Sequence, residues 1–371
     1  MRALRSIAVA GAALVTLATG IGAASADPTV TPATTDIVAV GSDTIQSLFD
    51  QFSTDYNATS PTHKLYSYEA TGSSTITTKN NDANCTITRP NGSGAGISQL
   101  TQNLKTADGN PCVDIGRASR NIKSSDGTGL AAVQFARDLI TYSYSTGGHA
   151  VTNLTSAQLT AIFNCSDATL GGTGTPVTWN EVGGTSTDAI IPVLPQASSG
   201  TRSTWLADLG ETWTTPPSCI VNGASSVDSS VIEENEGTNS EFTSANASVS
   251  DVIFPFSAGD YVGEVYTHTN SQSPGNLVLG SINSIAPLTA SNTINVSGFG
   301  TAYIRTLFAV VLSSGASPWV PTYLQPLLGA SNNTGWVCKG SATTVGTGPY
   351  DTTQAGFAPI TGLTCGAVTH Q

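Results

Sequence analysis

Hydroxyl-bearing residues gather in four short turns of this sequence, together with glycine and arginine. The turns contribute Asp43 and Thr44, then Ser93, then Ser119 and Arg120, and finally Ser199, Gly200, Thr201 and Arg202. Hydroxyl groups, guanidinium groups and unpaired backbone N–H groups all donate hydrogen bonds, and together they can saturate the oxygens of a small anion. The chemistry that these turns suggest is capture of an oxyanion, without a bond being broken.

The first and last turns each follow an apolar run that predicts a buried strand, and each precedes a helical pattern. Residues 36–40 lead into the first turn, and apolar residues at helical spacing follow over residues 45–52. Residues 189–194 lead into the last turn, and a helix carrying Trp205 follows. An ordinary helix cap explains one such turn equally well. Recurrence of the arrangement favours an α/β fold with ligand loops at the ends of strands.

The two middle turns are less regular. Residues 90–97 form a glycine-rich turn before a helix that we expect to start near Ser98. This turn lacks the G-x-G-x-x-G spacing and the lysine of a P-loop, so a nucleotide site is poorly supported and a flexible loop is the alternative to a second set of N–H donors. Residues 113–120 predict a short strand that runs into a loop with Arg117 and Arg120, although an arginine pair is usually solvated surface.

Further apolar patterns predict the elements that hold these turns in place. The run at residues 251–256 indicates a folded core. We expect a strand at residues 139–144, a helix over residues 155–163 and a core-facing helix around residues 303–311. In that last segment apolar residues recur at helical spacing: Tyr303, Ile304, Leu307, Phe308 and Val311.

The N-terminus predicts a secretory signal peptide. Arg2 and Arg5 precede an apolar run at residues 7–21, and Ala24-Ser25-Ala26 forms an A-x-A cleavage site before a Pro/Thr-rich linker at residues 27–35. A membrane anchor is the alternative, but the run is too short and too rich in Gly and Ala. No cysteine lies near the cleavage site, so a lipid anchor is not indicated. We expect a secreted, soluble protein.

The charge balance excludes one class of partner. The 371-residue chain has 13 basic and 25 acidic residues, and removal of Arg2 and Arg5 with the signal peptide leaves 11 basic residues and a net charge of −14. This charge argues against nucleic acid or an anionic membrane surface as the partner. A small anion is still allowed, because buried N–H and hydroxyl groups can hold it without a positive surface.

Six cysteines remain after export to an oxidising compartment, and their even number predicts three disulfides. Of the connectivities that six cysteines allow, we expect neighbours to pair: Cys85–Cys112, Cys165–Cys219 and Cys338–Cys365. A zinc site is the alternative, but no C-x-x-C occurs and the four histidines are scattered, so no metal ligand is assigned.

Three segments follow one another in a specific order. Residues 154–163 read LTSAQLTAIF, residues 177–184 read VTWNEVGG, and residues 191–202 end in SSGTR. Their order and spacing resemble the phosphate-binding proteins of high-affinity phosphate ABC transporters, and the resemblance covers roughly residues 36–366. It implies a type II periplasmic-binding-protein fold, with two α/β lobes, a two-crossover hinge and the anion in the cleft. The first lobe would comprise residues 36–139 and 255–371, and the second residues 140–254.

The same resemblance implies that inorganic phosphate is the ligand, bound without a cofactor. The implied phosphate ligands are the residues of the four turns: Asp43, Thr44, Ser93, Ser119, Arg120, Ser199, Gly200, Thr201 and Arg202. Two positions depart from the family. Pro195 lies where many members have arginine, and Arg120 lies where many have the aspartate that accepts the remaining proton of phosphate. Our hypothesis is that Asp43 takes over this role.

Other functions are weighed against capture. Ser93 or Ser199 could be a nucleophile, but no G-x-S-x-G elbow surrounds Ser199, since Thr201 occupies the second glycine position of that motif, and His268 lies in a polar stretch. We therefore expect no enzyme. One alternative is that the ligand is a different oxyanion or a phosphorylated compound. Another is that the fold is reused as a surface or interaction protein without anion binding. An ABC permease is a possible partner, and we expect a monomer.

Overall fold

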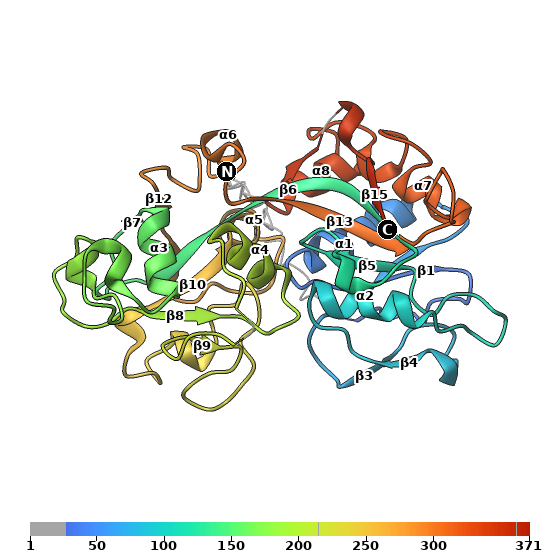
Figure 1. The fold of residues 1–371 in the computed structure, drawn as a ribbon. Coiled ribbons are helices and arrows are strands. Elements are labelled where there is room, and N and C mark those ends of the chain that lie inside the picture. Colours follow the sequence, from blue (N-terminus) through green and yellow to red (C-terminus); the bar gives the residue numbers. More distant parts are fainter. Residues whose placement is uncertain (1–26, 214, 361) are drawn as a thin grey trace, which may run out of the picture.

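Figure 1 shows two α/β lobes that lie side by side and are joined by two long strands. The computed structural model describes residues 27–371 except Thr214 and Thr361, so the expected signal peptide lies outside the described residues. The strands are β1 (Ile37–Gly41), β2 (Leu65–Ser67), β3 (Thr75–Thr77), β4 (Thr86–Thr88), β5 (Ile115–Ala118), β6 (Leu130–Ser145), β7 (Asn153–Leu154), β8 (Ile191–Leu194), β9 (Val221–Asn222), β10 (Val252–Ser257), β11 (Leu277–Leu279), β12 (Ser281–Ile282), β13 (Ile304–Leu312), β14 (Ala358–Pro359) and β15 (Val368–His370). The α-helices are α1 (Gln46–Ala58), α2 (Ser93–Gln102), α3 (Ser156–Phe163), α4 (Gly200–Asp208), α5 (Ala258–Val262), α6 (Val296–Phe299), α7 (Gln325–Leu328) and α8 (Gly348–Gln354).

Strands β6 and β13 form the hinge between the lobes. The largest sheet has the order β2-β1-β5-β13-β6-β10-β8-β9. The first part of β6 pairs antiparallel with β13 over Leu130–Leu139, and the second part pairs antiparallel with β10 over Ile140–Tyr144. One strand therefore serves both lobes, and β13 returns beside it.

Strand β13 corrects the expectation of a helix around residues 303–311. The segment from Ile304 to Leu312 pairs with β5 on one side and β6 on the other, and most of its residues are buried. A central strand that is covered on both faces has a nearly continuous apolar run, which cannot be distinguished from helical spacing over so few residues. The strand expected at residues 139–144 is likewise the end of a longer element, β6, and α2 begins at Ser93 rather than near Ser98.

The strand pairings also locate the point where the chain returns to the first lobe. Strand β11 pairs with the end of β6, β12 pairs with β7, and Phe299 of α6 packs in the core of the second lobe. The return therefore occurs at β13, later in the chain than the expected boundary near residue 254. Residues 27–35, expected as a linker, are attached to the first lobe, because Asp27 forms a 2.6 Å ion pair with Arg89.

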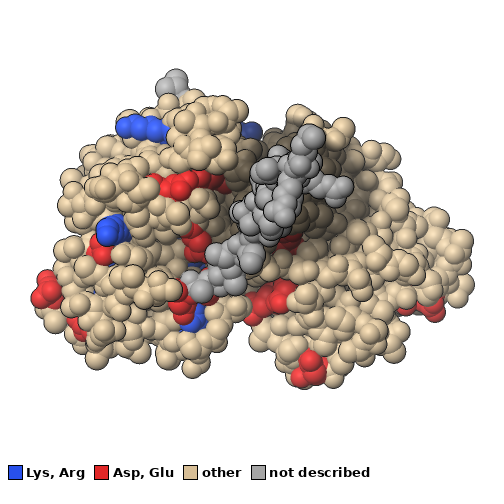
Figure 2. Space-filling view, turned by 180° about the vertical axis from the view of Figure 1, so that it is seen from behind, with Lys and Arg blue, Asp and Glu red and all other residues tan. Residues whose placement is uncertain are grey.

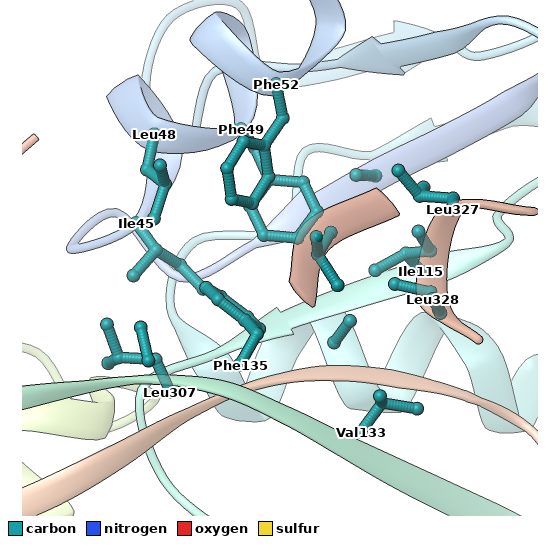
Figure 3. Packing of buried hydrophobic residues seen from close by; sticks show 14 of the residues in the cluster. Ile45, Leu48, Phe49, Phe52, Ile115, Val133, Phe135, Leu307, Leu327 and Leu328 are labelled. Carbon is teal, nitrogen blue, oxygen red and sulfur yellow. The ribbon is translucent and has the colours of Figure 1, made fainter. Parts of the chain in front are cut away.

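Each lobe has its own apolar core. In the first lobe, Phe49 and Phe52 of α1 both pack edge-on against Phe135 of β6, with ring centroids 5.9 Å apart in each case (Figure 3). In the second, Trp205 of α4 packs against Phe163 of α3. These cores hold the N-terminal ends of α1 and α4 in fixed positions, which matters because both ends lie where the lobes touch.

The three disulfides pair as expected. The bonds join Cys85 to Cys112, Cys165 to Cys219 and Cys338 to Cys365. Among the described residues, no helix is long and apolar enough to cross a bilayer. Figure 2 shows that uncharged residues form most of the surface on one face, in line with a chain in which only 10% of residues are charged.

Candidate anion-binding site

The predicted turns meet where the two lobes touch. Thr44, which follows β1, and Thr201, in the first turn of α4, have hydroxyl oxygens 3.3 Å apart. The backbone N–H of Gly94 in α2 donates to the carbonyl of Ser198 across the same contact, at 3.0 Å. The structure thus brings together six of the nine residues expected in the site, all within the closed contact: Thr44, Ser93, Ser119, Ser199, Gly200 and Thr201.

Gly200 is the point of closest approach. It opens α4 in the second lobe, and a Cβ atom built on it would lie 2.2 Å from Ser119 Oγ and 2.3 Å from Ser93 Oγ of the first lobe. Any side chain at this position would hold the lobes apart. The glycine is needed here for space.

The centre of the contact is occupied by the carboxylate of Glu234. Its Oε1 accepts from the hydroxyl of Ser42 at 3.0 Å and from the backbone N–H of Thr44 at 3.4 Å. Its Oε2 accepts from the hydroxyl of Ser199 at 2.5 Å and from the backbone N–H of Thr201 at 3.1 Å. Two donors come from each lobe, and two are backbone groups beside the N-termini of α1 and α4, where the helix dipole favours negative charge.

The local sequence explains why these donors are available. Ser199 is the N-cap of α4, and its hydroxyl oxygen accepts from the N–H of Arg202 at 3.0 Å while its proton points to Glu234. Thr201 lies in the first turn, where backbone N–H groups have no partner within the helix. The turn therefore forms the start of α4. The carboxylate of Glu234 accepts from the cap hydroxyl and from a backbone N–H group that has no partner within the helix.

Arg305 supplies the positive charge. It projects from β13, bonds Asp138 of β6 through Nε at 2.9 Å and Nη2 at 2.8 Å, and donates from Nη1 to Thr201 Oγ1 at 2.9 Å. Burial would raise the pKa of Glu234, but Arg305 and the hydrogen bonds from Ser199, Thr201 and Ser42 outweigh it and hold that pKa below its ordinary value. Glu234 is therefore ionised. Arg305 thus supplies a guanidinium group to the site, although Pro195 lies at the position where many members of the resembled family have arginine.

Ser93 and Ser119 form a second row behind the donors. The Oγ atoms of Ser42 and Ser119 lie 3.1 Å apart, and those of Ser119 and Ser93 lie 3.2 Å apart. The N–H of Ser119 donates to Ser93 Oγ at 3.0 Å. Both serines are fully buried. Ser119 contacts Ser42, which in turn donates to Glu234, so the two serines orient a donor and do not contact Glu234 themselves.

Asp43, Arg120 and Arg202 have partners outside this cluster. Arg120 pairs with both oxygens of Asp126 at 2.7 and 2.8 Å, and Arg202 donates from Nη1 to the carbonyl of Pro195 at 2.9 Å. Asp43 accepts from the side-chain amide of Gln272 at 2.9 Å.

The environment of Asp43 bears on the role proposed for it. Burial, and then the negative charges of Glu234 and Glu233, raise the pKa of Asp43 well above its ordinary value despite the Gln272 hydrogen bond. Burial and neighbouring acids raise the pKa of Asp260 and Glu264 in the same way. A raised pKa extends the pH range in which Asp43 holds its own proton, and in that range Asp43 cannot accept a proton from a ligand.

Sequence reasoning missed four residues that the structure places at the site: Ser42 as a donor, Glu234, Asn235 and Arg305. Glu234 lies in an acidic run, Glu233-Glu234-Asn235-Glu236, that is typical of solvated surface. Asn235 donates from its side-chain amide to Thr44 Oγ1 at 2.9 Å. Arg305 did carry a signal, because a lone arginine within an apolar run is rarely buried unless it is paired.

Away from this site, the described residues include a group of side chains that could ligate a metal: His149, Asp188 and Asp251. His149 Nδ1 lies 2.8 Å from an oxygen of Asp251 and 3.4 Å from one of Asp188, and Trp179 Nε1 donates to the same Asp251 oxygen at 2.9 Å. Ordinary hydrogen bonds account for these positions.

Comparisons with known proteins identify a family and a similar fold. A family model described as a PBP superfamily domain matches residues 26–277. A putative phosphate ABC transporter substrate-binding protein with bound phosphate, from Clostridium perfringens, is similar in structure, with a TM-score of 0.53 and 16% identity over 88% of this chain and 99% of that chain. An ABC-type phosphate transport receptor from Vibrio cholerae has a TM-score of 0.47 and 20% identity over 76% of this chain and 88% of that chain. No curated protein matches this chain. The fold is the expected two-lobed type II arrangement.

Proposed function

Because the chain belongs to the family of the PBP superfamily domain, we propose that it is an exported solute-binding protein that captures inorganic phosphate, or a similar oxyanion, between its lobes. The observation that carries the proposal is the convergence of four hydrogen-bond donors from both lobes on a single anionic group, the carboxylate of Glu234. Donors arranged in this way are suited to an oxyanion.

The energetics favour anion capture at this point. An anion taken out of water must have its oxygens saturated by donors, and hydrogen bonds to a charged group are stronger than neutral ones. Backbone N–H groups at helix N-termini cost little to order, because the helix already holds them. Arg305 adds a buried positive charge on β13, one of the two hinge strands.

Catalysis is not part of the proposal. Ser199 donates to Glu234, which is the geometry of a nucleophile beside a base. The surroundings of Glu234 hold its pKa below the ordinary value, whereas a general base works best with a pKa near the working pH. The pair is better suited to holding charge than to moving a proton.

The proposal is tested by calorimetry on residues 27–371, stripped of ligand by unfolding and refolding, with phosphate, sulfate and a phosphate monoester. The wild-type protein and the Glu234→Ala variant are titrated side by side. We expect one-to-one binding of phosphate that Ser199→Ala weakens by about tenfold or more, since one charge-assisted bond is lost. Arg120→Ala is the matched control and leaves the affinity unchanged, because Arg120 is paired with Asp126.

A second candidate function has a specific observation in its favour. Glu234 already satisfies the donors, which suits a protein that keeps the fold as an interaction module and binds no external anion. This alternative predicts no heat with any oxyanion for either the wild-type protein or Glu234→Ala, both shown to be folded by circular dichroism. That result would refute the capture proposal.

Export, monomeric state and a permease partner belong to the same proposal. Export is supported by the N-terminal pattern of residues 1–26, and the permease by the family. Light scattering on the purified protein tests the monomer, and co-purification with a phosphate permease tests the partner.

A further inference from the structure

Glu234 joins the two lobes from a short segment of the second one. The segment Glu233–Asn235 lies between β9 and β10, and all three of its side chains reach the first lobe. Glu233 accepts from the side-chain amide of Asn91 at 2.8 and 2.7 Å, and Asn235 donates to Thr44. Glu234 is fully buried between its neighbours. The lobes are thus closed on a group that belongs to the chain itself.

We propose that Glu234 is an internal ligand that determines the affinity and specificity of this site, so that an external anion binds only by displacing its carboxylate from the donors of both lobes. This inference rests on the proposed function and adds to it the residue that a ligand must compete with.

Two anions cannot share these donors. The hydroxyl of Ser199 and the N–H groups of Thr44 and Thr201 each carry one proton, and each proton is directed at Glu234. An incoming anion could use them only after the carboxylate has moved away.

The local charge gives a second reason. Arg305 donates to the hydroxyls of Thr201 and Thr44 but already pairs with Asp138, and a second buried cation, Arg117, donates to the backbone carbonyl of Ser42. With Glu234 ionised, Arg305, Asp138 and Glu234 carry one positive and two negative charges. A phosphate dianion added beside them would be strongly repelled in so buried a place, whereas departure of Glu234 into solvent removes one negative charge.

Competition of this kind also discriminates between ligands. A free carboxylate offers the donors two oxygens and one charge, as Glu234 does, but it lacks the advantage of being attached to the chain. A tetrahedral oxyanion offers more oxygens and more charge to the same donors, and to the hydroxyls of Thr44 and Thr201 beside them. The site should therefore reject acetate and other monocarboxylates and accept phosphate.

The apparent affinity equals the intrinsic affinity multiplied by the fraction of molecules in which Glu234 has left the donors. If that fraction is about 1%, removal of the carboxylate raises the affinity about a hundredfold. We expect a gain of at least about tenfold for Glu234→Ala and a smaller gain for Glu234→Gln, which keeps the volume but loses the charge.

The experiment titrates phosphate and acetate into the wild-type protein, Glu234→Ala, Glu234→Gln and Glu236→Gln. Glu236→Gln is the matched control, because Glu236 lies in the same acidic run, its replacement removes the same charge, and it accepts a local hydrogen bond from Thr238 at 2.7 Å. X-ray scattering of the phosphate-free proteins supplies a second readout, since loss of the internal ligand should open the lobes and enlarge the radius of gyration.

The outcomes separate this inference from the proposed function. Tighter phosphate binding by both Glu234 variants, with Glu236→Gln unchanged, supports both. Equal phosphate affinity in the wild-type protein and in both Glu234 variants leaves the capture function standing and overturns the role of Glu234. Absence of phosphate binding in all four proteins refutes the capture function, and the inference with it.

Discussion

Replacement of Gly200 by alanine tests whether the lobes must close tightly over the anion. The added Cβ would lie 2.2 and 2.3 Å from two buried serine hydroxyls of the other lobe, so something must move by about an ångström. Overpacking of this size costs about 1–3 kcal/mol. Because the clash is between lobes, the closed form bears the cost, and we expect the affinity for phosphate to fall by roughly fivefold to a hundredfold.

The sign of the effect makes the test sharp. Gly200 is the first residue of α4, and alanine is a better helix former than glycine by up to about 1 kcal/mol. Without the clash, Gly200→Ala would therefore be neutral or stabilising. The matched control is Gly94→Ala in α2, which faces the same contact but meets its nearest atom, the Ser198 carbonyl oxygen, at an ordinary 3.5 Å.

Both variants are compared with the wild-type protein by calorimetry with phosphate and by X-ray scattering in its presence. We expect Gly200→Ala to bind more weakly and to remain more open, and Gly94→Ala to behave as the wild-type protein does. Equal affinity and equal radius of gyration for the two variants would refute the argument that closure requires glycine at this point.

Other substitutions test the buried charges and the disulfides. Arg305→Met leaves two buried carboxylates without their cation and should lower the free energy of unfolding in urea by about 3–5 kcal/mol; a loss below 1 kcal/mol would show that the cluster is solvated. Burial and the carboxylate of Asp55 raise the pKa of Asp351 to about 8. Since an unfolded aspartate titrates near 3.9, the wild-type protein should lose stability relative to Asp351→Asn as the pH rises from about 4 to 8, and a difference independent of pH in urea melts would contradict this. Replacing Cys165 and Cys219 by alanine opens a loop closed over 54 residues and should cost about 4 kcal/mol in thermal unfolding, with phosphate affinity unchanged.

Local patterns account for what the sequence predicts well. The start of α4 follows from a buried strand, a serine that caps and a glycine, all within ten residues, and the structure has this order. The capping box at Thr155 and Gln158 likewise defines the start of α3, where the helix was expected. Each of these features depends on neighbours in the chain, so periodicity and cap chemistry are sufficient.

Features that depend on distant segments were not predictable in this way. Whether Ile304–Leu312 is strand or helix is decided by β5 and β6 on either side, and its apolar run fits both. Glu234 is buried only because Ser42, 192 residues away, and the start of α4 close over it. The sequence of an acidic run does not indicate such burial. The family resemblance predicts the hydrogen-bond donors but not the carboxylate that accepts from them.

The charge state of a buried acid near the site leads to a further prediction, because a neutral carboxyl group repels an anion less than a carboxylate does. The pKa of Asp43 is raised well above its ordinary value, first by burial and then by Glu234 and Glu233, so its carboxyl group stays uncharged to a higher pH than an exposed aspartate does. As the pH rises through that pKa, Asp43 gains a negative charge next to the donor Thr44 and repels the ligand. The affinity of the wild-type protein for phosphate should therefore fall with rising pH relative to that of Asp43→Asn. The ratio of the two affinities at each pH removes the titration of phosphate itself, since both proteins bind the same ions. A ratio that stays constant from pH 6 to pH 9 would show that Asp43 does not titrate in this range and would contradict the prediction.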